Sequence, residues 1–170
     1  LLGGSGRDRF DGNPGDNLII GGGGGDDYVS YSNGMQGSLG VTVNLVTGVA
    51  SNTYGGIDTL LEIRGINGSR GDDLLIGSDK LSGEVGLSGY PSSGTTFWAS
   101  LGSDQIDGTR PLASNNMYYN VSFFDEATIL VEFSDYDSAT VTKSLGGVDT
   151  LTDVQGIHGT IGNDVLKGSP

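Results

Sequence analysis

A nine-residue repeat opens the chain and constrains its fold more than any other feature of the sequence. Three consecutive blocks, at 3–11, 12–20 and 21–29, follow the pattern Gly-Gly-x-Gly-x-Asp-x-U-x, in which U is a large apolar residue. Glycine permits the backbone conformations that a tight, repeatedly bent loop demands. Each block therefore predicts a six-residue loop followed by a three-residue strand. A short fixed period favours an architecture of stacked, similar units.

The middle residue of each predicted strand is large and apolar. These residues are Phe10, Ile19 and Tyr28. Because successive side chains of a strand point to opposite faces, the three are expected to line a narrow apolar interior, with their neighbours outside.

A second, longer repeat relates the two halves of the chain. Residues 55–78 match residues 146–169 without a gap, at a spacing of 91 residues (146 minus 55). Each copy contains a degenerate nonapeptide, at 68–76 and 159–167, and a looser one lies at 99–107.

Strand-like alternation precedes both copies of the longer repeat. In the expected strand 41–46, Val41, Val43 and Leu45 alternate with polar residues. Ile129, Val131 and Phe133 show the same period of two, although Leu130 breaks strict alternation, and this period is typical of half-buried strands. No helical period is evident, so an all-β chain is predicted.

The two repeats together suggest two modules. The first spans 1–79 and the second 99–170, with a Ser/Gly-rich insertion at 80–98 between them. That insertion and the polar stretch 108–117 are expected to be loops. Phe97 and Trp98 are interpreted as a cap on the end of an apolar core, with sugar binding as the alternative.

Composition excludes several classes of function. The formal net charge of −13 argues against binding to nucleic acid or to an anionic membrane surface. The chain has no cysteine, and hence neither a disulfide nor a thiolate metal site. No apolar run approaches membrane-spanning length, and no signal peptide is visible. The chain starts without Met and is interpreted as a fragment of a longer repetitive protein.

Catalytic constellations are weakly supported. The single histidine, His158, follows Gly156-Ile157 in the second repeat copy and is interpreted as a turn residue. Asp125, Glu126 and Glu132 could form a carboxylate pair by residue type alone. One histidine without cysteine does not make the usual zinc site. The chain is therefore not expected to be an enzyme by itself.

The tandem blocks GGSGRDRFD, GNPGDNLII and GGGGGDDYV resemble the RTX (repeats-in-toxin) haemolysin-type calcium-binding repeats of large secreted bacterial proteins. The segment GVTVNLVTGVA and the GGIDTLLEIRGINGSRGDDLLIG that follows it are similar to segments between such repeats. The resemblance implies a parallel β-roll or β-solenoid with calcium in the turns, here interrupted by loop or strand insertions.

In such a roll two blocks make one coil, so like positions recur after eighteen residues. Asp8 and Asp26 are then expected to stack on one edge, with Asn17 on the opposite edge. Neighbouring strands lie about 4.8 Å apart, and calcium–oxygen bonds measure about 2.3–2.6 Å. A calcium ion therefore fits between two stacked loops.

The resemblance also implies a set of ligands, made of sixth-place side chains and loop carbonyls. Carried over to this sequence, the candidate metal ligands are Gly4, Gly6, Asp8, Asn17, Gly22, Gly24, Asp26, Asp73, Asp104 and Asp164. Asn17 offers only a neutral amide oxygen, so its edge is expected to bind calcium more weakly.

The function implied is that of a calcium-binding structural module in a secreted or cell-surface protein, exported by a type I channel and folding on calcium outside the cell. A scaffold, adhesin or surface-layer role is one expectation, and an accessory domain of a secreted protease, lipase or alginate epimerase is the alternative. The expected partners are calcium ions and either copies of the chain or a cell-surface ligand, without nucleic acid or membrane insertion.

Overall fold

The fold is all-β. The computed structural model describes residues 1–23, 26–33, 39–78, 93–99, 101–108, 118–123, 128–135, 138–154 and 156–168. These residues form sixteen strands and no helix. None of the described segments is therefore a helix able to cross a membrane.

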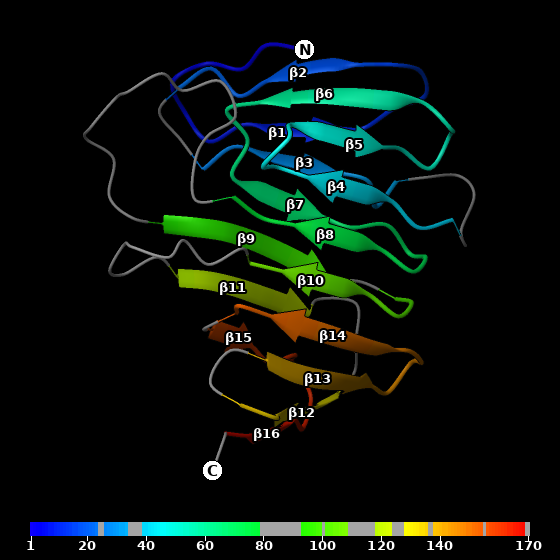
Figure 1. The fold of residues 1–170 in the computed structure, drawn as a ribbon, viewed down its shortest axis with the longest axis vertical. Helices are drawn as coiled ribbons and strands as arrows, with labels where there is room; N and C mark the ends of the chain where they lie inside the picture. The colour runs from blue at the N-terminus through cyan, green and yellow to red at the C-terminus, as the bar shows by residue number, and fades with distance from the viewer. Residues whose placement is uncertain are drawn as a thin grey trace.

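The strands form two sheets, and the chain passes back and forth between them (Figure 1). The smaller sheet has six strands, all paired in parallel in the order β1-β3-β7-β9-β11-β15. Its strands are β1 (Arg9–Asp11), β3 (Tyr28–Ser30), β7 (Gly65–Asn67), β9 (Ser93–Ala99), β11 (Tyr118–Phe123) and β15 (Gly156–His158).

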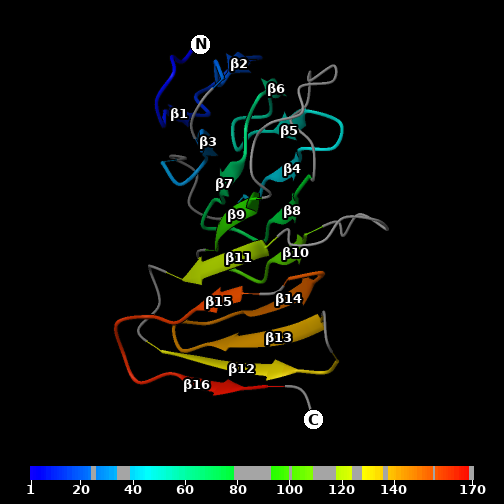
Figure 2. The same cartoon turned by 90° about the vertical axis from the view of Figure 1, so that its left-hand side faces the viewer.

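The larger sheet has ten strands with mixed pairing, in the order β16-β12-β13-β14-β10-β8-β4-β5-β6-β2. Its strands are β2 (Leu18–Ile20), β4 (Thr42–Asn44), β5 (Val49–Ser51), β6 (Ile57–Leu61), β8 (Leu74–Ile76), β10 (Gln105–Asp107), β12 (Ile129–Phe133), β13 (Ser138–Lys143), β14 (Val148–Thr152) and β16 (Val165–Lys167). In Figure 2 the N-terminal strands of the two sheets lie in separate layers, with β1, β3, β7 and β9 opposite β6, β5, β4 and β8.

Two antiparallel meanders interrupt the parallel pairing of the larger sheet. Strands β4, β5 and β6 form the first meander, and β12, β13 and β14 form the second. Each folds back so that its last strand pairs in parallel with an earlier one, β6 with β2 and β14 with β10. The chain then adds one strand to the smaller sheet, β7 or β15, and returns to the larger sheet. There the next strand, β8 or β16, pairs with the first strand of the meander.

The 91-residue repeat is visible in the strand bounds. β6, β7 and β8 recur 91 residues later as β14, β15 and β16. The residue that follows β6 by one position, Glu62, has a φ of 59°, and its counterpart Asp153 has a φ of 54°. The two copies therefore share even a backbone conformation that side-chain-bearing residues seldom adopt.

Most of the strands predicted from the nonapeptides are confirmed, but the third is displaced by one residue. β1 and β2 coincide with the predicted strands, whereas β3 pairs Phe10 with Val29 rather than with Tyr28. Val29 is fully buried, and Tyr28 lies on the outer face. The expectation for Tyr28 was wrong because five consecutive glycines accommodate one extra residue, so that the pattern effectively starts at Gly22.

The core lies between the two sheets. It is lined by the inward side chains of both, including Phe10, Ile19, Val29, Leu60, Ile66, Leu75, Phe97, Ile106, Val121, Val131, Val141 and Leu151. The stretches 41–46 and 129–133 contribute alternate residues to it, as predicted.

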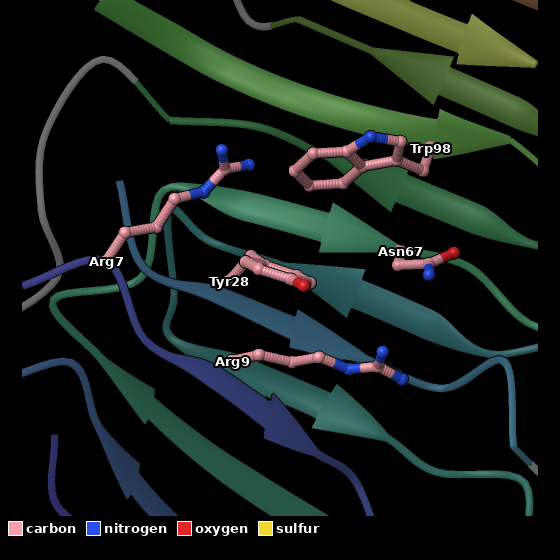
Figure 3. A pocket seen from close by; sticks show the side chains of 5 residues that line it. All are labelled: Arg7, Arg9, Tyr28, Asn67 and Trp98. Atoms are coloured by element: carbon pink, nitrogen blue, oxygen red, sulfur yellow. The ribbon is translucent and has the colours of Figure 1, made fainter. Parts of the chain in front are cut away.

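The predicted insertion at 80–98 is only partly a loop. Its last six residues belong to β9, whose described side chains alternate between core and surface, and residues 79–92 lie outside the described part of the chain. Phe97 and Trp98 do not cap an end of the core, because β9 lies inside the six-stranded sheet, between β7 and β11. Phe97 is fully buried in the core. Trp98, the next residue of β9, faces outward, and its ring lies close to that of Tyr28 (Figure 3).

Candidate functional site: an aspartate ladder and glycine-rich loops

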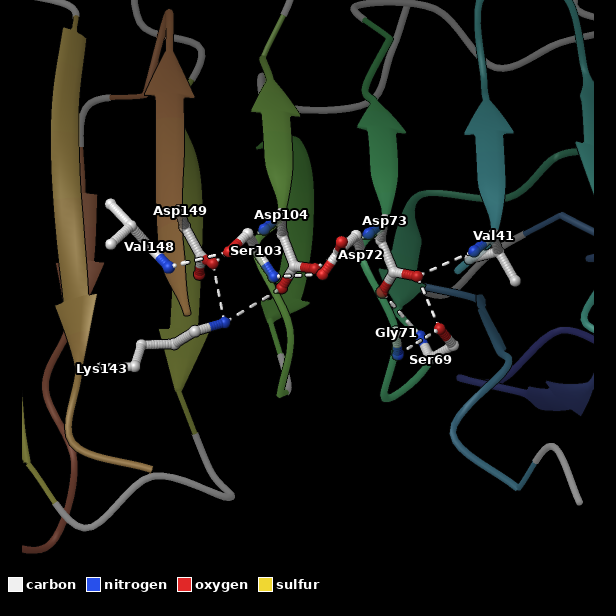
Figure 4. A network of polar contacts seen from close by, with 10 residues as sticks. All are labelled: Val41, Ser69, Gly71, Asp72, Asp73, Ser103, Asp104, Lys143, Val148 and Asp149. Atoms are coloured by element: carbon white, nitrogen blue, oxygen red, sulfur yellow. Dashed lines mark hydrogen bonds and ion pairs between the residues drawn. The ribbon is translucent and has the colours of Figure 1, made fainter. Parts of the chain in front are cut away.

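Aspartate side chains at the start of the strands connect each loop to the next. The backbone N–H of Asp73 donates to Asp104 Oδ1 at 3.0 Å, and that of Asp104 donates to Asp149 Oδ1 at 2.9 Å (Figure 4). Four more bonds of this kind run from Asp8 N to Asp27 (2.7 Å), Asn17 N to Asp58 (3.0 Å), Val41 N to Asp73 (2.8 Å) and Ile129 N to Asp164 (2.9 Å). We call this set of carboxylates the aspartate ladder.

Two ladder carboxylates, Asp73 and Asp164, also close their own loop. The second oxygen accepts the N–H of the residue four positions earlier, from Ser69 to Asp73 (2.7 Å) and from Thr160 to Asp164 (2.6 Å). Asp8, whose own N–H donates to Asp27, closes its loop in the same way through the Gly4 N–H (2.7 Å). Ser69 and Thr160, which are 91 residues apart, add a hydroxyl bond to the same carboxylate. These bonds lower the pKa of Asp164 below its usual value, although burial alone would raise it. The sixth-place aspartate thus organises the loop before any metal is considered.

The predicted stacking of Asp8 on Asp26 was wrong, whereas Asn17 lies before a strand of the other sheet, in keeping with its expected place on the opposite edge. Asp8 contacts Asp27, nineteen positions away, and Asp26 is exposed. The displaced register of the third block is the reason. Asn17 stacks on Asp58, to which its amide also donates at 2.8 Å. Gly24 lies outside the described residues.

Sequence reasoning missed three members of the ladder, Asp27, Asp58 and Asp149, all of them buried. A signal existed for the last two, because Gly-Gly-Ile-Asp-Thr-Leu and Gly-Gly-Val-Asp-Thr-Leu are shortened forms of the nonapeptide. Asp27 could not be separated from Asp26 by pattern, since both follow the glycine run.

Negative charge gathers at the N-terminal loops. Asp27 is 1% exposed, and burial together with the like charges of Asp8, Asp26 and Glu62 raises its pKa, against the lowering effect of the Asp8 N–H. Glu62 accepts the N–H of Gly22 at 3.0 Å. Three carboxylates therefore act on the buried Asp27 where two loops meet.

Carbonyl oxygens point from each loop into the next. At Gly22, where φ is 95°, a Cβ atom would lie 2.7 Å from the Gly3 oxygen and 2.9 Å from the Gly4 oxygen. At Gly102, where φ is 98°, it would lie 2.5 Å from the Gly71 oxygen. Glycine is required at both positions by conformation and by close approach. Candidate donors such as Gly4 and Gly22 thus lie between stacked loops.

A lysine balances the ladder near its other end. Lys143 Nζ lies 3.3 Å from Asp104 Oδ2 and 2.7 Å from Asp149 Oδ1, and all three side chains are fully buried. Burial, followed by the negative charges of Asp149 and Asp73, raises the pKa of Asp104 to about 8 despite the ammonium. Burial also raises the pKa of Asp73. The buried ammonium therefore offsets part of the charge of this end of the ladder, and burial favours the protonated form of Asp104.

The donor atoms along the loops suit a hard cation. They are carboxylate and carbonyl oxygens, which calcium binds in groups of six to eight. Within the described ranges, no group of three or more His, Cys, Asp or Glu side chains could hold a metal ion. Backbone carbonyls would therefore supply a large share of the ligands.

The weak catalytic candidates remain separate from this site. His158 is exposed at the end of β15, and Glu132 forms an exposed ion pair with Lys167 at 2.8 Å. Asp125 and Glu126 lie outside the described residues.

Comparison with known proteins adds no family to these observations. No protein-family model matches the chain, and no curated protein matches it. Function is therefore inferred from the chemistry of the ladder and its loops.

Proposed function

We propose that this chain is a calcium-binding structural module of a secreted or cell-surface bacterial protein, with a β-roll in which calcium ions join successive glycine-rich loops. The module serves as a scaffold and is not itself an enzyme. Its export through a type I channel is part of the same proposal, since a chain that folds only in calcium-rich medium stays unfolded where calcium is scarce.

The negative charge at the N-terminal loops is the main support for calcium binding, because no cation of the protein balances it among the described ion pairs. These ion pairs join Arg9 to Asp11, Lys143 to Asp104 and Asp149, and Lys167 to Glu132. None involves Asp8, Asp26, Asp27 or Glu62. A buried carboxylate such as Asp27, with like charges around it, requires compensation by a proton or a cation.

The residues that would hold calcium lie where these loops stack. Asp8 and Asp27 would contribute carboxylate oxygens. The carbonyls of Gly4, Gly6 and Gly22 would complete the set. Asn17 on the opposite edge is a weaker candidate because its oxygen is neutral. Asp104 is weaker too, because Lys143 already supplies a positive charge there.

Calcium would supply positive charge and oxygen coordination, which convert repulsion between loops into attraction. Because the sites form only when loops stack, the free energy of binding becomes free energy of folding. Each site is expected to bind at about 10⁻⁴–10⁻³ M, as extracellular calcium modules do.

The test is circular dichroism of the full chain in chelator and during a calcium titration, with isothermal titration calorimetry for the affinity. The strand signal should appear with calcium at about 10⁻⁴–10⁻³ M, and magnesium at the same concentration should replace it poorly. A complete strand signal in chelator that calcium leaves unchanged would disprove the proposal.

A charge-matched pair of variants locates the site. The double variant Asp8→Asn, Asp27→Asn should shift the calcium midpoint upward by tenfold or more. The control Asp11→Asn, Asp107→Asn removes two carboxylates from the last positions of β1 and β10 and should leave the midpoint within about twofold. Equal shifts in the two variants would mean that general charge, not these loops, controls folding.

A further inference from the structure

The outer face of the six-stranded sheet carries a hollow that the calcium loops do not explain. It has a volume of about 460 Å³ and is lined by Arg7, Arg9, Tyr28, Asn67 and Trp98 (Figure 3). Ligand pockets commonly measure roughly 300–1,000 Å³ and combine aromatic walls with a few placed polar groups. The hollow meets this description in size and in chemistry.

Strand alternation explains why these side chains gather. Phe10, Val29, Ile66 and Phe97 form one inward row across β1, β3, β7 and β9, so the residues on either side of them point outward. Parallel pairing then sets Arg9 beside Tyr28, and Asn67 beside Trp98.

Gly65 allows the two aromatic rings to meet across β7. A Cβ atom at this position would lie 2.6 Å from Tyr28 Cβ and 2.8 Å from Trp98 Cζ3. With no side chain between them, the ring centroids of Tyr28 and Trp98 lie 5.0 Å apart at an interplanar angle of 45°. The pair forms a continuous aromatic platform, half-buried in the sheet.

Arginine side chains lie beside the platform, although the protein as a whole is strongly acidic. Arg7 Cζ lies 5.5 Å from the Tyr28 ring centroid and 5.8 Å from that of Trp98. Arg9 pairs with Asp11 at 2.9 Å, whereas no described carboxylate forms an ion pair with Arg7. Two of the eight lysine and arginine residues of the chain thus border one hollow, and no described carboxylate lines it.

We propose that this hollow binds one acidic sugar residue of a saccharide chain, with the sugar ring against Trp98 and Tyr28 and its carboxylate or sulfate beside Arg7. A sugar ring has an apolar face that matches an aromatic surface. Its hydroxyl groups can pair with Asn67, and a guanidinium presents a fork of donors that fits a carboxylate or sulfate. A long nucleic acid is disfavoured by the net charge of −13.

Trp98 makes the test direct because it is the only tryptophan of the chain. Its fluorescence is followed at saturating calcium while trigalacturonate, a sulfated carrageenan tetrasaccharide, maltotriose or AMP is added. At least one acidic saccharide should change the emission with a saturable curve, and maltotriose should bind at least tenfold more weakly. The two acidic probes decide whether a carboxylate or a sulfate is preferred.

Variants assign the binding to the platform. Arg7→Gln should weaken the binding of the acidic saccharide by tenfold or more and leave the weak binding of maltotriose unchanged, because only the acidic saccharide carries a charged group for the guanidinium to bind. Arg70→Gln, at an exposed position in the loop before β8, removes the same charge and is the control. Trp98→Ala, measured by calorimetry, should abolish detectable binding.

Several results would overturn the saccharide site. They are an unchanged Trp98 emission with all saccharides, equal loss in the Arg7 and Arg70 variants, or tighter binding of AMP than of the acidic saccharides. Circular dichroism of every sample separates these results from failure of calcium-dependent folding, since the site is tested only on folded protein.

Discussion

At the scale of single residues, an equivalent buried carboxylate has different bonding partners in the two copies of the longer repeat. Asp58 accepts the Asn52 amide at 3.2 Å and the Tyr31 hydroxyl at 3.0 Å. Its counterpart Asp149 is paired instead with Lys143, which stands 91 residues after Asn52. One copy is therefore held by neutral donors and the other by a buried ion pair, and removing a partner of a buried charge is costly.

Replacing Lys143 with Met should destabilise the protein by about 3–5 kcal/mol, because Asp104 and Asp149 would lose their buried counter-charge. Replacing Lys167 with Met is the matched control, since its ion pair with Glu132 is more than half exposed on both sides. That change should cost less than about 1 kcal/mol. Both values come from urea denaturation at saturating calcium, and similar losses in the two variants would contradict a special role for the buried ammonium.

At the scale of elements, the glycine-rich loops pack backbone against backbone. The loop between β2 and β3 rests on the loop before β1, with Gly22 facing the Gly3 and Gly4 carbonyls. Gly6 also lies in the loop before β1, but it has open space around it. The two glycines therefore belong to similar loops and differ in what a side chain would meet.

Gly22→Ala should destabilise the protein by more than about 1–2 kcal/mol, since alanine disfavours a positive φ and its methyl group would push the loops apart. It should also raise the calcium concentration required for folding. Gly6→Ala should change stability by no more than about 1 kcal/mol. Thermal unfolding at several calcium concentrations measures both effects. A Gly22 variant as stable as the Gly6 variant would show that the loops are not closely stacked.

Many of the strand positions were predictable from sequence, and the exceptions have identifiable causes. The short strands β1 and β2 follow directly from the block pattern, because alternation places Phe10 and Ile19 inside. The position of β3 did not follow, because Tyr28 and Val29 are both apolar and the preceding glycines allow either register.

The pairing of the meanders was also beyond the sequence. Alternation in 41–46 indicates a strand but does not predict which strand pairs with it. In the larger sheet β4 does not pair with β2, because β5 and β6 lie between them. In the site, Asp8 and Asp73 were anticipated as calcium ligands. The role of Asp73 as acceptor of the Val41 N–H from a neighbouring loop depends on that unpredicted pairing.

At the scale of the whole molecule, the two sequence modules share their sheets. β8 pairs with β4 on one side and with β10 on the other, and β9 lies between β7 and β11 in the same way. Hydrogen bonds and core side chains therefore continue across the boundary between the modules. Neither module therefore ends in a free sheet edge at that boundary.

Unfolding should accordingly be a single transition. Urea denaturation at saturating calcium, followed by Trp98 fluorescence and by circular dichroism, should give coincident curves, as expected for one cooperative unit. Trp98 reports on β9 in the middle of the smaller sheet, whereas circular dichroism reports on all strands. Two separate midpoints would show that the modules unfold independently.

The unequal strand numbers of the two layers leave one end of the molecule uncovered. Among the described strands, ten pair in one sheet and six in the other, and β16 at the end of the longer sheet is exposed along its length. Leu166 in β16 is 55% exposed, whereas Leu75, the corresponding residue 91 positions earlier, is fully buried. Any strand added beside β15 would extend the smaller sheet toward this bare surface, as the terminal units of stacked folds require a cap.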